Sequence, residues 1–279
     1  MESKMKNLVV RTLSGAVLVA VVMGAILLSR WSFGALMLAI TIGCMVEIYN
    51  MSRVAGYEPL TVMGVVASIC VVGFGVDGFF NSSELSIPIA LFLMAIVPLM
   101  FIVECFRDRK QPMVNIALTL MPLLYIAAPM ALMVGVPVQL GGGEWNPLIM
   151  VAYFFVVWAN DSFAYLVGVS CGRHHICVRL SPKKTWEGLV GGIVGSIGIA
   201  VAAAHLLDGD LYVWGGMAVV ISVSGIFGDL VESMFKRSVD IKDSGKLLPG
   251  HGGWLDRFDA LILSAPFVMV YLLLINFAK

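Results

Sequence analysis

The chain has 279 residues, of which 59% are hydrophobic and only 13% are charged. A soluble protein of this length carries about a quarter charged residues, so one or two soluble domains are excluded, and disorder is excluded because it needs low hydrophobicity and high charge. The formal net charge is zero, which argues against a nucleic-acid partner. The five scattered cysteines do not form a disulfide framework. The composition therefore indicates a polytopic membrane protein.

Nine stretches are apolar enough to cross a bilayer as helices, each of which needs about 20 residues. The first is too long and too hydrophobic for a cleavable signal peptide, and no window alternates like a membrane barrel strand. We therefore predict an all-α fold with about nine transmembrane helices. The predicted spans are residues 8–29, 31–49, 61–79, 86–104, 114–138, 148–170, 186–206, 211–231 and 260–277.

Lysine and arginine decide the orientation of these helices, because cytoplasmic loops are rich in both. If the N-terminus is cytoplasmic, only Arg30 and Lys279 of the 18 basic residues lie on the outer side. A miscounted helix would invert every later loop and destroy this asymmetry. We therefore predict a cytoplasmic N-terminus.

The polar residues concentrate in the second half of the chain. The two longest cytoplasmic loops are residues 171–185 and 232–259, and no internal repeat is evident. We divide the chain into N-terminal scaffold helices, residues 1–140, and a C-terminal catalytic region, residues 141–279. Glu47 and Glu104, at cytoplasmic helix ends in the first half, are interpreted as part of the scaffold or an interface.

Two motifs around the loop 171–185 are interpreted as structural. Two cysteines and two histidines between Cys171 and Cys177 are spaced too tightly for a usual zinc site, so we expect a polar loop. Small residues recur in the helix that follows and predict close backbone packing. They are Gly188, Gly191, Gly192 and Gly195.

Two carboxylates lie inside predicted membrane helices, Asp161 in 148–170 and Asp229 near the cytoplasmic end of 211–231. A charge within the membrane is costly and is a functional hypothesis by default. For Asp161 the alternative is a packing role, with the carboxylate hydrogen-bonded to Asn or Ser.

Polar residues continue beyond Asp229 at intervals of one helical turn. This spacing places them on one stripe and predicts a helix that runs to about residue 240. An amphipathic helix at the headgroup level is the alternative, but it does not explain why acids and bases share the stripe. The stripe consists of Asp229, Glu232, Ser233, Lys236, Arg237 and Asp240.

The loop after this helix combines Gly and Pro with many charges. Glycines let the backbone approach a ligand closely, and carboxylates with Lys and Arg are the groups that hold magnesium and polyphosphate. No Walker A motif is present. The charged residues are Lys242, Asp243, Lys246, His251, Asp256, Arg257 and Asp259.

A third cluster precedes the helix 186–206. Ser181, Lys183, Lys184 and Thr185 place two hydroxyls and two ammonium groups at a helix N-terminus, which predicts an anion site. Taken alone, paired lysines at this boundary are an ordinary topology signal.

The segment Ser233–Asp259 closely resembles the signature of the phosphatidate cytidylyltransferase, or CDP-diacylglycerol synthase, family. It carries Lys-Arg, Lys-Asp, Leu-Pro, His-Gly-Gly and Asp-Arg-Phe-Asp in the family's order. The segments 181–188 and 160–162 resemble the same family, so the resemblance covers less than half of the chain. Trp254 stands where the family has a smaller aliphatic residue, and we expect no mechanistic consequence.

The resemblance implies that CTP and phosphatidic acid react at a membrane to give CDP-diacylglycerol and pyrophosphate. It places the paired metal ligands on Asp229 and Asp256 and implies Mg²⁺, with K⁺ nearby. It also implies a homodimer in the inner cell membrane, with the active site facing the cytoplasm.

Charge complementarity then suggests roles for the remaining residues. The cations would neutralise the two substrates, His251 would donate a hydrogen bond, and the acids Asp161, Asp243 and Asp259 would hold metal or basic partners. Hydroxyls and nearby cations would complete substrate binding. The cations are Lys183, Lys184, Lys236, Arg237 and Lys242, and the further binding residues are Ser181, Thr185, Ser233, Lys246 and Arg257.

Three other functions remain open from the sequence. A CTP-dependent kinase or cytidylyltransferase acting on another lipid would use similar charges. An ion-coupled transporter would use Asp161 and Asp229 as cation sites, but the inverted repeats usual in transporters are missing. A non-catalytic scaffold would leave the charged loops unexplained.

Overall fold

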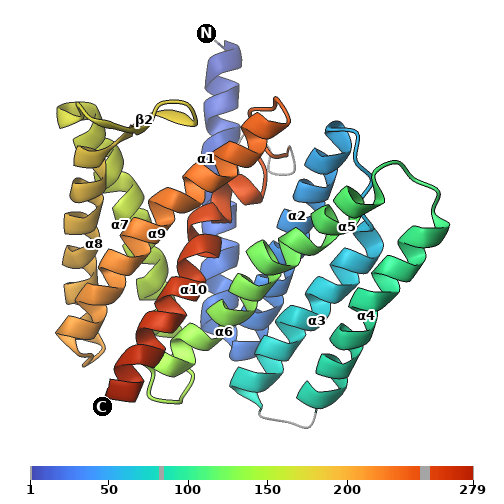
Figure 1. Ribbon diagram of the computed structural model, residues 1–279. Coiled ribbons are helices and arrows are strands. Elements are labelled where there is room, and N and C mark those ends of the chain that lie inside the picture. The colour runs from blue at the N-terminus through green and yellow to red at the C-terminus, as the bar shows by residue number, and fades with distance from the viewer. Residues whose placement is uncertain (1, 82–84, 246–251, 279) are drawn as a thin grey trace. The chain divides into compact units, whose positions relative to one another are not determined.

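The computed structural model describes residues 2–81, 85–245 and 252–278, with side chains from 12 to 277 of these ranges. Its described residues are mostly helical (Figure 1). A five-residue π-helix, η1 (Leu123–Ala127), joins α5 to α6 directly after Pro122. The helices are α1 (Glu2–Leu28), α2 (Arg30–Val54), α3 (Thr61–Phe80), α4 (Ser86–Phe106), α5 (Pro112–Pro122), α6 (Ala128–Leu140), α7 (Pro147–Cys171), α8 (Trp186–Leu206), α9 (Leu211–Ser238) and α10 (Leu255–Ala278).

Eight helical segments among the described residues are long and apolar enough to cross a membrane. The continuous run Pro112–Leu140 counts as one of them, and a shorter apolar helix, Thr12–Leu28, precedes them. This agrees with the nine predicted spans and confirms an all-α polytopic membrane protein. The cytoplasmic position of the N-terminus stays a prediction.

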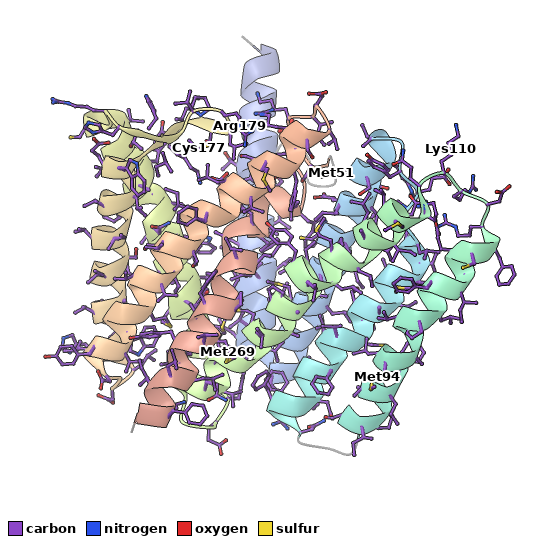
Figure 2. The ribbon with its side chains drawn as sticks, in the orientation of Figure 1. Met51, Met94, Lys110, Cys177, Arg179 and Met269 are labelled. Carbon is purple, nitrogen blue, oxygen red and sulfur yellow. The ribbon has the colours of Figure 1, made fainter. Side chains whose placement is uncertain are left out.

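Exposed apolar side chains fit a lipid environment. Figure 2 shows Met94 on α4, which is 73% exposed, and Met269 on α10, which is only 3% exposed. A soluble protein avoids large contiguous apolar surface, whereas a transmembrane helix presents such side chains to lipid.

The chain divides into two compact units. The first comprises Met1–Gly135 and Ser238–Phe258, and the second comprises Val136–Arg237 and Asp259–Lys279. The division of the chain into a scaffold, 1–140, and a catalytic region, 141–279, stays a prediction.

In the first unit, buried hydrogen bonds fix α2 against α5. The Tyr49 hydroxyl donates to the Thr119 carbonyl over 2.9 Å, and the Thr119 hydroxyl accepts from the Leu60 amide over 2.8 Å. Buried polar groups are costly without such partners. These contacts set the end of α2 that carries Glu47.

In the second unit, α7 and α8 pack closely along the glycines predicted for this purpose. A Cβ at Gly188 would lie 2.8 Å from the Ala164 carbonyl oxygen, and one at Gly192 would lie 2.5 Å from the Asn160 side-chain oxygen. Gly195 faces the Phe163 ring in the same way. The prediction of close backbone approach is confirmed.

The segment between α7 and α8 is a hairpin rather than a polar loop. Strand β1 (His175–Cys177) pairs antiparallel with β2 (Ser181–Thr185). The Trp186 amide donates to the His174 carbonyl over 2.9 Å, and the Glu187 side chain accepts from the amides of Arg173 and His174. The bond between Trp186 and His174 lies next to the paired strands, and Glu187 attaches the start of the hairpin to α8. Periodicity along the sequence did not reveal this hairpin.

The two cysteines at this hairpin, Cys171 and Cys177, are free thiols. Within the part of the chain that the structure describes, the metal-competent group of side chains lies elsewhere. The interpretation of Cys171–Cys177 as a non-zinc segment stays a prediction.

Helix α9 continues past the apolar span as predicted, but it ends at Ser238. Asp240 lies beyond the helix with a positive φ of 55°, so its assignment to the polar stripe is wrong. Short polar residues such as Asp tolerate this left-handed conformation and end helices. Glu232 and Ser233 face the interior, whereas Met234 is exposed.

We expect Gly188→Ala to destabilise the protein by about 1–3 kcal/mol, because the new methyl group would overpack against a backbone carbonyl. Thermal unfolding in detergent measures this change. Gly198→Ala is the matched control on α8, since a Cβ there meets nothing within 4 Å, and we expect no loss of stability. Equal unfolding temperatures for the two variants would contradict the packing described.

Candidate active site

Three carboxylates of the second unit converge where α9 and α10 approach each other. One oxygen from each of Asp229, Glu232 and Asp259 lies within 4.8 Å of the others. Asp229 and Glu232 are one turn apart on α9, and Gly228 allows the close approach of α10, since a Cβ there would lie 2.5 Å from the Asp259 carbonyl oxygen. The glycine before Asp229 therefore helps to build the cluster.

Two lysines pair with these acids. Lys184 forms an ion pair with Asp229 and donates to the Ile226 carbonyl over 3.2 Å, and Lys236 pairs with Glu232 at 2.6 Å. The Glu232 side chain is only 2% exposed, whereas that of Asp229 is 45% exposed. We call these five residues, Lys184, Asp229, Glu232, Lys236 and Asp259, the lysine-paired cluster. Asp229 is its accessible acid.

Asp161 lies near this cluster, within electrostatic range of Lys184 and Asp229. Its neighbour Asn160 is buried and donates to it over 3.4 Å. The side-chain oxygen of Asn160 has no hydrogen-bond partner among the described residues. Asp161 is exposed and lies beside this cluster in the second unit, and its functional role stays a prediction.

The residues before α8 that were predicted to form an anion site have different roles in the structure. The Thr185 hydroxyl caps α8 by accepting from the Gly188 amide over 3.1 Å, which stabilises the helix N-terminus. Lys183 is exposed and Ser181 is half-buried. Lys184 is the member of this group that joins the lysine-paired cluster.

A second group of acids lies in the first unit. Glu47 of α2 accepts hydrogen bonds from Trp254 N (2.8 Å), Leu255 N (3.0 Å) and the Ser244 hydroxyl (2.8 Å). Asp256 accepts from Gly253 N over 2.8 Å and from Ser244 N over 3.3 Å. We call Glu47, Ser244 and Asp256 the Glu47 cluster.

The other sequence-predicted residues lie around these clusters or outside the described ranges. Lys242, Asp243 and Arg257 are exposed in the first unit, whereas in the second unit Arg237 is exposed and Ser233 is buried. Lys246 and His251 lie outside the described residues. The use of Asp229 and Asp256 as one metal pair stays a prediction.

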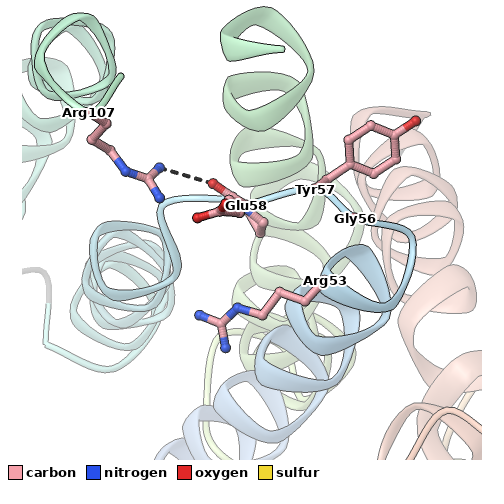
Figure 3. Close-up of a pocket in the computed structure, with 6 residues that line it drawn as sticks. Arg53, Gly56, Tyr57, Glu58 and Arg107 are labelled. Carbon is pink, nitrogen blue, oxygen red and sulfur yellow. Dashed lines mark hydrogen bonds between the residues drawn. The ribbon is translucent and has the colours of Figure 1, made fainter. Parts of the chain in front are cut away.

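A polar pocket of about 350 Å³ lies in the first unit at the connection between α2 and α3 (Figure 3). Arg107 donates to the Glu58 carbonyl and to the Glu104 side chain, and Arg53 donates to the Thr61 hydroxyl. Bonds within the chain thus engage both arginines, and no sequence-predicted site residue lines the pocket. The lining residues are Arg53, Gly56, Tyr57, Glu58, Pro59 and Arg107.

The sequence analysis assigned Glu47 to the scaffold or an interface and left Glu232 without a role. Glu47 lies inside the predicted span 31–49, so the argument applied to Asp161, that an intramembrane carboxylate is a functional hypothesis, would have selected it. Glu232 was placed on the polar stripe, but its burial depends on the packing of α9.

The fold and these clusters define an all-helical membrane protein in which acids and bases gather at helix ends. Comparison with known families identifies the family to which the chain belongs. A model of the cytidylyltransferase family matches residues 9–275, so the chain belongs to that family, as the resemblance predicted.

Curated relatives match a shorter part of the chain. It is 43% identical over 122 residues to a phosphatidate cytidylyltransferase of Staphylococcus aureus (strain COL), a match that covers 43% of this chain and 47% of the relative. Phosphatidate cytidylyltransferases of Staphylococcus haemolyticus and Staphylococcus epidermidis are 42% and 43% identical over the same length. The match thus spans about half the length of these relatives.

We expect Lys236→Met to destabilise the protein by about 3 kcal/mol, because it leaves Glu232 buried without its cation. Adding Glu232→Gln should restore most of this loss, since the uncompensated charge is then removed. Unfolding in detergent measures both variants, with Lys183→Met at an exposed lysine as control. A Lys236→Met variant as stable as the wild type would show that the pair is unimportant.

Proposed function

We propose that the chain transfers CMP from CTP to phosphatidic acid, giving CDP-diacylglycerol and pyrophosphate in phospholipid synthesis. The support is membership of the cytidylyltransferase family, similarity to curated relatives that are phosphatidate cytidylyltransferases and the signature over residues 233–259. We also propose an inner-membrane location with the site facing the cytoplasm, and a homodimer.

The observation that carries the proposal is the lysine-paired cluster. Two polyanions must meet during the reaction, so the site needs cations and groups that organise them. Lys184 and Lys236 supply positive charge, and their acidic partners hold them at fixed places. A site that contains both lysines and carboxylates can bind phosphate groups together with a metal cation.

The carboxylates fit a hard divalent cation. Mg²⁺ prefers oxygen ligands and keeps water or phosphate in its shell, and the three clustered carboxylates of the second unit offer oxygens of this kind. We propose that Asp229 and Asp256 hold Mg²⁺, with K⁺ nearby, and that Glu232 and Asp259 assist Asp229. When bound, Mg²⁺ neutralises charge on the triphosphate.

The residues of the chain then align the reactants. An oxygen of the lipid phosphate forms a bond to the α-phosphorus of CTP while the bond from that phosphorus to the leaving pyrophosphate breaks. The lipid phosphate is already ionised at neutral pH, so positioning and charge neutralisation are sufficient. Lys183, Lys184, Lys236, Arg237 and Lys242 would neutralise the substrates and the leaving group.

We expect purified protein in detergent to convert phosphatidic acid and labelled CTP into a product that carries CMP. Asp229→Asn and Asp256→Asn should each reduce the rate by at least about 100-fold, a typical loss for a preorganised electrostatic group. Product mass and a Mg²⁺ titration are the measurements.

A product that gains only phosphate would indicate a lipid kinase instead. Substrate uptake into sealed vesicles without CTP would favour a transporter. Full activity of both Asn variants would overturn the metal assignment.

We expect Lys184→Ala to weaken CTP binding and turnover by about 10-fold or more, as expected for the loss of a charged hydrogen bond. Binding and turnover are measured separately. Lys110→Ala, an exposed lysine between α4 and α5 (Figure 2), is the control and should leave both values unchanged. Unchanged values for Lys184→Ala would remove that residue from the site.

A further inference from the structure

Glu47 is a buried carboxylate whose charge is held by hydrogen bonds rather than by a cation. It is 5% exposed, and no ion pair joins it to any other described residue. Both of its oxygens are used: Oε1 accepts from Trp254 N, and Oε2 accepts from Leu255 N and the Ser244 hydroxyl. Leu255 N is the first amide of α10 and Trp254 N directly precedes it, at a helix N-terminus where a negative charge is stabilised.

Ser244 links Glu47 directly to Asp256. Its hydroxyl lies 2.8 Å from Glu47 Oε2 and 3.2 Å from Asp256 Oδ2, and its amide donates to the same Asp256 oxygen. The Ser244 hydroxyl lies between the two carboxylates. It has one hydrogen to donate, so the two carboxylates share a single donor. The position of Asp256 is therefore tied to that of Glu47, which lies more than 200 residues earlier in the sequence.

The glycines around these carboxylates support the same interpretation. A Cβ at Gly245 would lie 2.4 Å from Glu47 Oε1, and one at Gly253 would lie 2.1 Å from the Ser244 hydroxyl. Gly252 adopts a positive φ of 83°, and a Cβ there would lie 2.7 Å from Asp256 Oδ2. These glycines make room for the chain's own carboxylates.

The Trp254 side chain makes a second contact between the start of α10 and α2. A Cβ at Gly43, one turn before Glu47, would lie 2.7 Å from the Trp254 ring, which stacks on Phe258 with centroids 5.9 Å apart. Gly43 and Glu47 thus present one face of α2 to the start of α10. The tryptophan that departs from the family pattern has a defined packing partner in this chain.

We propose that Glu47 is a positioning residue that, through Ser244 and the amides of Trp254 and Leu255 at the start of α10, holds Asp256 where it binds a divalent cation. The inference rests on the function proposed above, in which Asp256 is a metal ligand. Glu47 itself touches neither substrate nor metal in this role.

The test is a double-mutant cycle read by Mn²⁺ binding to the purified, substrate-free protein in detergent, with free Mn²⁺ measured by electron paramagnetic resonance. We expect Glu47→Gln to weaken Mn²⁺ binding at least fivefold, because the amide nitrogen that replaces one oxygen cannot accept these hydrogen bonds. In the Asp256→Asn background the same change should have no further effect, since Glu47 acts through Asp256.

Glu104→Gln is the matched control. Glu104 is also a buried carboxylate of the first unit, but it bonds to Arg107 and Asn115 and not to the Glu47 cluster. Its Mn²⁺ binding should equal that of the wild type. Ser244→Ala is the second variant if Glu47→Gln does not fold, because it removes only the bridging hydroxyl, and it should weaken Mn²⁺ binding at least twofold with little change in unfolding temperature.

Wild-type Mn²⁺ affinity in Glu47→Gln or in Ser244→Ala would overturn the proposal, as would an equal effect of Glu47→Gln in both backgrounds. Absence of Mn²⁺ binding to the wild type would also overturn it. Normal Mn²⁺ binding without any CMP transfer would overturn only the function proposed above, so the two failures are distinguishable.

Discussion

The cost of burying charge is the constraint on which the rest of this structure depends. A carboxylate removed from water loses several kcal/mol of hydration free energy unless partners replace the water. The chain meets this cost in two ways. Cations pair with some buried carboxylates, as Lys236 does with Glu232 and Arg107 does with Glu104, whereas amides and a hydroxyl surround Glu47. Helix ends provide the unpaired amides that make the second solution possible.

Close approach of backbones is the second requirement, and glycine meets it in both units. Gly228 lets the Asp259 backbone come near α9, and Gly253 leaves room for the Ser244 hydroxyl and the Glu47 carboxylate. A side chain at either position would displace the acids that the sequence places there. The described glycines of the charged loop, Gly245, Gly252 and Gly253, therefore make room for the protein's own polar groups. Their presence does not require a bound phosphate at each glycine.

Hydropathy alone predicted the membrane spans, because the length of an apolar segment needs no knowledge of its neighbours. Helical spacing similarly predicted the stripe from Asp229 to Arg237, and the motif after Ser233 predicted the family. The hairpin 175–185 and the contacts of Glu47 were beyond such reasoning. Glu47 and Ser244 are 197 residues apart, and a periodic pattern reports only neighbours on one element. Their meeting is a property of tertiary packing.

The partners of the acids also indicate which charges can change partners during a reaction. Asp229 is 45% exposed and paired with one lysine, so an incoming cation and phosphate can replace that pair while conserving charge. Glu47 is buried with both oxygens bonded to its own chain, and replacing those bonds would disrupt the start of α10. Asp229, held by a lysine, therefore suits chemistry, whereas Glu47, with both oxygens bonded to its own chain, suits positioning. The distinction follows from the identity of the donor, since an ammonium can pair with a phosphate elsewhere and a backbone amide cannot leave its helix.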